Sequence, residues 1–192
     1  MNLGFSLSLS GPGLWYSTRA AGVVTLLLFT GSVVLGILNA ARFSSDRYPR
    51  FLIQGLHRNL SLLAVAFLVV HIGTTVVDTY TSIGLQDAII PFIGSYKTFW
   101  LGLGAIASDF MILVAITSVG RQRLGHRSWR MVHWCAYLSW PIAMMHALGI
   151  GTDAHSTWML VIAFLCAASV VISLGYRGLQ AMPARRVEKV AR

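Results

Sequence analysis

The chain has 192 residues, of which 56% are hydrophobic and 11% charged, and its mean hydropathy is +0.69. Soluble domains carry about 25% charged residues, so this composition excludes a soluble enzyme and a disordered protein. Despite a net charge of +9, it also argues against nucleic-acid binding, because the basic residues have a topological explanation. Cys135 and Cys166 both lie within apolar runs, which argues against a disulfide framework or a zinc site.

Five apolar runs are long enough to cross a bilayer, which takes about 20 mostly apolar residues. In chain order they are residues 20–41, 59–77, 98–119, 131–152 and 156–176. Only the third contains a charge, Asp109. No basic segment precedes the first run, and it is too long for the core of a signal peptide. The sequence therefore predicts an all-α integral membrane protein, a bundle of five transmembrane helices.

The basic residues predict how this bundle is oriented. Thirteen of the fifteen fall in the first connection, the third connection and the C-terminal tail: Arg42, Arg47, Arg50, Arg58, Arg121, Arg123, Arg127, Arg130, Arg177, Arg185, Arg186, Lys189 and Arg192. Because cytoplasmic segments carry the excess of Lys and Arg, we expect the N-terminus outside and the C-terminus in the cytoplasm. We expect an outer segment at 1–13, the transmembrane domain at 14–176 and a basic cytoplasmic tail at 177–192. Residues 86–92, outside, are expected to lie along the membrane interface.

Four histidines form two sets at matched depths. The second and fourth runs both lead from the cytoplasm to the outside; His57 and His133 lie near their starts, His71 and His146 near their outer ends. On the second helix the fourteen-residue spacing falls about 40° short of four turns and rises about 21 Å, so one face presents both histidines. The thirteen residues from His133 to His146 leave these two about 140° apart on a straight helix. Pro141 lies between them, so a kink or altered winding is expected there.

Matched pairs of histidines inside a membrane favour haem ligation. Neutral imidazole is a natural axial ligand of haem iron, and ionisable groups within a bilayer are costly and usually functional. The alternative is that each histidine merely hydrogen-bonds a neighbouring helix. Two pairs at two depths favour two b-type haems and a path for electrons across the membrane.

The His-x13-His and His-x12-His spacings resemble the bis-haem transmembrane domain of the ferric reductase and NADPH oxidase superfamily. Residues 124–133, LGHRSWRMVH, are similar to the haem-binding subunit of periplasmic methionine sulfoxide reductase, while residues 14–19 and 54–61, LWYSTR and QGLHRNLS, look like actinobacterial ferric-reductase-like proteins. The resemblance implies a bacterial inner-membrane protein in which His57 and His133 hold an inner haem b and His71 and His146 an outer one.

Four further residues have two interpretations each. Arg19, at the depth of the outer pair, either meets a propionate of the outer haem or extends to the membrane surface. Arg58 and Arg130 flank the inner pair and either meet its propionates or belong only to the cytoplasmic positive charge. Trp140, midway between His133 and His146, either fills the space between the haems or packs within the bundle.

The leading functional hypothesis is a dihaem cytochrome b that carries electrons from a cytoplasmic-side donor to an outside acceptor: ferric iron, oxygen or a periplasmic reductase. No side chain is expected to make or break bonds. The chain ends about sixteen residues after the last run and lacks a Gly-rich dinucleotide fingerprint, so a flavin is expected on a separate protein. The alternatives are a quinol-linked membrane anchor in which Asp109 handles protons, and a non-redox haem carrier or scaffold.

Overall fold

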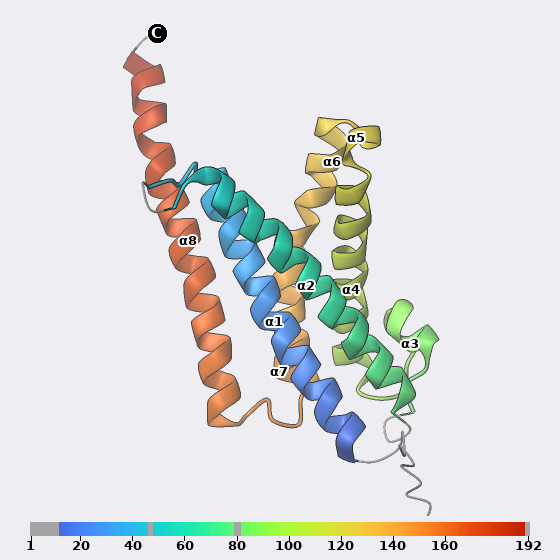
Figure 1. The fold of residues 1–192 in the computed structure, drawn as a ribbon. Coiled ribbons are helices and arrows are strands. Elements are labelled where there is room, and N and C mark those ends of the chain that lie inside the picture. Colours follow the sequence, from blue (N-terminus) through green and yellow to red (C-terminus); the bar gives the residue numbers. More distant parts are fainter. Residues whose placement is uncertain (1–11, 46–47, 79–81, 191–192) are drawn as a thin grey trace, which may run out of the picture.

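The computed structural model describes residues 12–45, 48–78 and 82–190, and within these ranges the chain forms helices and no strand (Figure 1). An α-helix satisfies its backbone hydrogen bonds internally, which a segment surrounded by lipid must do. The all-α prediction is confirmed. Residues 1–11, most of the expected outer segment, lie outside the described residues.

Four helices are long and apolar enough to cross a membrane: α1 (Pro12–Ala40), α2 (Arg50–Val77), α4 (Thr98–Val119) and α8 (Thr157–Val190). They coincide with the first, second, third and fifth apolar runs. Their length and composition, without any membrane in the structure, identify a multi-pass membrane protein. α8 extends well past residue 176, so the backbone of the expected tail continues the last helix.

The fourth apolar run does not form one long helix. It is divided between α6 (His126–His133) and α7 (Cys135–Ile150), which meet at Trp134. The Tyr137 amide donates to the Trp134 carbonyl at 3.0 Å, a bond to the third residue back that is typical of 3₁₀ winding. Pro141 lies inside α7 without ending it. The interruption therefore lies at Trp134 rather than at Pro141. Because a 3₁₀ turn advances about 120° per residue instead of about 100°, it reduces the angle between His133 and His146.

Two shorter helices lie in the connections. α3 (Leu85–Ile89) follows α2, and its Leu85 and Ile89 side chains are exposed. α5 (Arg121–Leu124) precedes α6. The interfacial position of residues 86–92 stays a prediction, since no bilayer is present to test it.

Successive connections between the long helices lie at alternate ends of the bundle, as the sequence predicts. α5, α6, the α1–α2 connection and the C-terminal part of α8 lie toward one end of the bundle, and α3 and the α7–α8 turn toward the other (Figure 1). The basic connections therefore share one end. Which end faces the cytoplasm stays a prediction.

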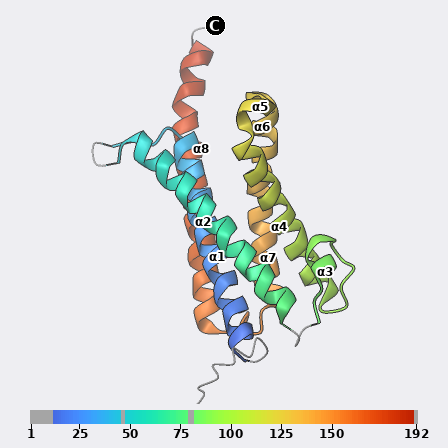
Figure 2. The same ribbon diagram turned by 45° about the vertical axis from the view of Figure 1, so that its right-hand side comes forward.

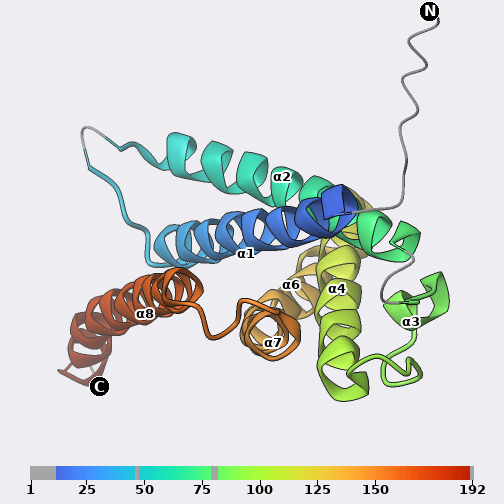
Figure 3. The ribbon, with the colours of Figure 1, turned by 90° about the horizontal axis from the view of Figure 1, so that it is seen from below.

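The helices pack as two pairs, with α8 beside the first. α1 packs most extensively on α2, α4 on α7, and α8 on α1, as two further views show (Figures 2 and 3). One core cluster joins α1, α2, α4 and α8 through Phe29, Val33, Ile37, Ala64, Leu68, Met111 and Val170. A second joins α1, α7 and α8 through Leu26, Met144, Met159, Ala163 and Cys166. This packing sets α2 opposite α6 and α7, the helices that carry the four histidines.

Candidate haem-binding site

The structure brings the four histidines together in the two pairs expected from their depth. The ring centroids of His57 and His133 lie 6.1 Å apart, and those of His71 and His146 lie 6.5 Å apart. One metal ion bound to two imidazoles at about 2.0–2.1 Å would separate their centroids by roughly 6.4 Å. Both separations therefore fit a pair of axial ligands to one iron.

Three of the histidines are oriented by a backbone carbonyl on a neighbouring helix. Nδ1 of His57 lies 2.9 Å from the Ser32 carbonyl oxygen, and Nδ1 of His71 lies 2.8 Å from that of Thr18. Nδ1 of His146 lies 2.7 Å from the Trp100 carbonyl oxygen.

A carbonyl oxygen only accepts hydrogen bonds, so Nδ1 must carry the proton at these three rings, and the lone pair is left on Nε2. Metal-ligating histidines almost always donate their second ring N–H in this way, which fixes the tautomer and the ring orientation. The three imidazoles thus have the form that an axial ligand needs.

His133 is the exception. Its Nδ1 is buried and has no hydrogen-bond partner within the described part of the chain. Its ring is instead stacked by Trp129, with the centroids 4.9 Å apart and the planes 29° apart.

Glycines allow helices α1 and α4 to approach the outer pair. A Cβ atom at Gly104 would lie 2.5 Å from Nδ1 of His146, and one at Gly22 would lie 3.0 Å from Cε1 of His71. The backbone carbonyls reach these imidazoles partly because no side chain intervenes.

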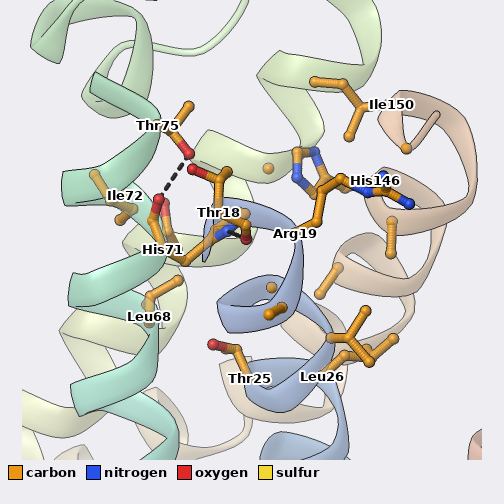
Figure 4. Close-up of a pocket in the computed structure, with 18 of the residues that line it drawn as sticks. Thr18, Arg19, Thr25, Leu26, Leu68, His71, Ile72, Thr75, His146 and Ile150 are labelled. Carbon is orange, nitrogen blue, oxygen red and sulfur yellow. Dashed lines mark hydrogen bonds between the residues drawn. The ribbon is translucent and has the colours of Figure 1, made fainter. Parts of the chain in front are cut away.

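A cavity of about 720 Å³ surrounds the outer pair, a volume within the range of about 300–1,000 Å³ that is common for ligand and cofactor sites. Its lining comes mainly from α1, α2, α4, α7 and the α7–α8 turn, with a few residues from α3, α8 and the connections beside α3, and it is predominantly apolar. Figure 4 shows His71 and His146 among these lining side chains, with Thr18 and Arg19 of α1 beside them. The cavity extends inward as far as Phe29 and Met111.

Charged side chains lie toward the outer end of this cavity. Arg19 lines it, forms an ion pair with Asp153 of the α7–α8 turn, and lies over the Trp15 ring at 4.1 Å. Asp78, which is buried at the end of α2, also lines it. The Arg19–Asp153 pairing was not expected from the sequence, since the two residues are far apart in the chain. The propionate role of Arg19 stays a prediction.

The other predicted site residues lie toward the inner end or between the pairs. Arg58 on α2 and Arg130 on α6 are exposed, and neither forms an ion pair with another residue in the described part of the chain. Trp140 is half-buried on α7 and donates from Nε1 to Oγ1 of Thr30 at 2.9 Å, which ties α7 to α1 between the two histidine pairs. Asp109 is half-buried on α4 and is not part of the cavity lining that the structure describes.

Among the described residues, no group of three or more His, Cys, Asp or Glu side chains could hold a metal ion. Axial ligation of haem needs only two side chains per iron, because the porphyrin supplies the remaining ligands.

Comparison with known families identifies a family that matches most of the chain. The model of the family described as "Ferric reductase like transmembrane component" matches residues 21–144, more than half of the chain. This range includes three of the paired histidines and ends just before His146. No curated protein and no solved structure matches the chain.

Proposed function

The chain belongs to the ferric-reductase-like transmembrane family, and we propose that it is a dihaem b-type cytochrome that moves electrons from a cytoplasmic-side donor to an acceptor outside. The observation that carries this proposal is that the four imidazoles form two couples. The ring centroids lie 6.1 Å apart in one couple and 6.5 Å apart in the other. The two couples lie at opposite ends of α2 and of the segment formed by α6 and α7. A scaffold without haem has no need of two such couples.

The proposed ligands are His57 and His133 for the inner haem and His71 and His146 for the outer one. When bound, the haems supply two one-electron carriers at two depths of the membrane. If these four imidazoles held the two haems, electron transfer would require no side chain to make or break a bond. What the chain contributes is the position of the ligands and a largely apolar setting.

At His57, His71 and His146 the Nδ1–H donates to a backbone carbonyl, which leaves the lone pair on Nε2 and raises the basicity of the imidazole as a ligand. The largely apolar lining of the cavity, including Leu26, Leu68 and Met111, leaves few groups that bind water near the two imidazoles. The two histidines of α2 are fourteen residues apart, a rise of about 21 Å along the helix. Trp140 lies between these levels on α7, and we propose that it occupies part of the space between the haems.

The proposed topology has five crossings with the N-terminus outside, and α6 and α7 together make the fourth. These two helices span residues 126–150, or about 37 Å at 1.5 Å per residue, which exceeds the hydrocarbon thickness of about 30 Å. The donor is proposed to be a separate flavoprotein that docks on the basic segment containing α5 and α6. The proposed acceptor is ferric iron, oxygen or a periplasmic reductase.

Vesicles test this proposal. The purified chain, loaded with haem, is reconstituted into liposomes that enclose ferricyanide, and dithionite is added outside. We expect the enclosed ferricyanide to lose its absorbance only in vesicles that carry the protein. His57→Ala and His71→Ala, each removing one ligand, should slow the loss toward the rate of empty vesicles. Equal rates with the wild type and both variants would refute transmembrane electron transfer through the two sites.

A further inference from the structure

The four histidines are not held alike. Three have an Nδ1 atom within 2.9 Å of a backbone carbonyl oxygen on another helix. His133 has no such bond in the described part of the chain, although its Nδ1 is buried. A metal-ligating imidazole without a second-shell partner is free to rotate, because the second-shell bond is what orients the ring. Something else must hold His133.

Trp129 makes the contact that His133 otherwise lacks. It lies four residues before His133 on α6, so both side chains lie on the same face of the helix. Their rings are stacked at 4.9 Å and 29°. Trp129 is itself attached to α4, because its Nε1 donates to the hydroxyl oxygen of Ser118 at 3.3 Å. The indole therefore links the ring of His133 to a neighbouring helix, as the carbonyl bonds do for the other three.

The nearby Trp134 shows that this contact is specific. It directly follows His133 in the chain, yet its side chain is 60% exposed and, among the described residues, it makes no ring contact. Two tryptophans thus lie next to the inner site, and only Trp129 is packed against the imidazole.

We propose that Trp129 is the positioning residue of the inner haem site and that it sets the plane of the His133 ring by stacking. This inference rests on the proposed function, since it assigns His133 as an axial ligand. Stacking restrains the ring plane without bonding to Nδ1. The inner haem would therefore be held by one hydrogen-bonded imidazole, His57, and one that is only stacked, whereas both imidazoles of the outer site are hydrogen-bonded. Dependence on Trp129 is therefore confined to the inner haem.

Three variants of the haem-loaded full chain test this role: Trp129→Leu, Trp129→Phe and, as matched control, Trp134→Leu. The readouts are haem per chain, the low-spin electron paramagnetic resonance signal of each haem, which reports ligand orientation, and the midpoint potential of each haem. In Trp129→Leu we expect the inner signal to shift or disappear, with roughly 10–100-fold weaker inner-haem binding, as for the loss of other second-shell partners. Trp129→Phe, which can still stack, should retain the wild-type signal, and Trp134→Leu should change neither haem.

The outer haem serves as the internal control for folding. The proposal is wrong if Trp129→Leu leaves the content, signal and potential of the inner haem unchanged. Loss of both haems to the same extent also contradicts it, because Trp129 would then act in general packing. If Trp129→Phe behaves as Trp129→Leu does, stacking alone does not set the ring plane and the proposal is wrong as stated, because phenylalanine keeps the stacking and loses only the hydrogen bond to Ser118. A wild-type chain without haem would instead overturn the proposed function.

Discussion

Replacing Gly104 by alanine should selectively weaken the outer haem site. Gly104 lies on α4 against the imidazole of His146, and its added Cβ would lie 2.5 Å from Nδ1. The same Nδ1 is held at 2.7 Å from the Trp100 carbonyl oxygen. The α4 backbone is packed against α7, so the ring must move rather than the helix.

The size of the effect follows from these distances. Ordinary van der Waals contact for a Cβ begins at 3.4 Å, so the ring must retreat by about 0.9 Å. A hydrogen bond of 2.7 Å that lengthens by this amount passes the usual limit of about 3.2 Å. Loss of a second-shell partner typically lowers metal affinity about 10–100-fold, which corresponds to roughly 1.4–2.7 kcal/mol of binding free energy. Alanine favours a helix over glycine by roughly 1 kcal/mol, so destabilisation of α4 itself does not explain such a loss.

The assay is haem titration of the purified chain, followed by visible absorption and by electron paramagnetic resonance for each haem. Three further glycines give a graded control. At Gly22 the new Cβ would lie 3.0 Å from His71, at Gly36 it would lie 3.3 Å from His57, and at Gly73 nothing lies within 4 Å. We expect the effect to fall in the order Gly104→Ala, Gly22→Ala, Gly36→Ala, with Gly73→Ala unchanged. A Gly104→Ala chain with wild-type affinity for both haems would refute the reasoning.

Two predictions concern topology and the donor. A reporter fused after Arg192 should read as cytoplasmic and one inserted near Gln86 as outside, because most basic residues share one end of the bundle; the reverse pattern would invert the proposed direction of electron flow. Changing Arg121, Arg123 and Arg127 together to Glu should slow haem reduction by a cognate acidic flavoprotein in stopped-flow measurements at low salt, because complementary charge raises association rates. The haem spectrum and reduction by dithionite should stay unchanged, and an unaltered rate with the flavoprotein would place its docking surface elsewhere.

Much of the fold could be predicted because lipid imposes a simple rule. A run of about 20 apolar residues in a bilayer forms a helix, and four of the five predicted runs are long helices in the structure. The division of the fourth run into α6 and α7 was harder to predict, because the interruption at Trp134 depends on a local change in backbone hydrogen bonding. Pro141 is the stronger helix breaker in the sequence, yet it lies inside α7.

The pairing of the histidines followed from their depth alone, whereas their supports could not be predicted. The carbonyls that orient the imidazoles belong to Ser32, Thr18 and Trp100. Every residue has a backbone carbonyl, so the amino-acid sequence does not indicate which of them will accept such a bond. The Arg19–Asp153 ion pair likewise depends on how the α7–α8 turn folds over α1. The position of Asp78 near the outer pair could have been predicted, because Asp78 follows His71 by seven residues and so lies on nearly the same helix face.

The most direct test of the account is the haem content of the purified chain and of four single variants, His57→Ala, His71→Ala, His133→Ala and His146→Ala, measured as the pyridine haemochrome. The account predicts about two b-type haems per wild-type chain. It predicts that His57→Ala and His133→Ala lose one and the same haem, and that His71→Ala and His146→Ala lose the other. A wild-type chain without haem, or variants of one pair that deplete different haems, would contradict it.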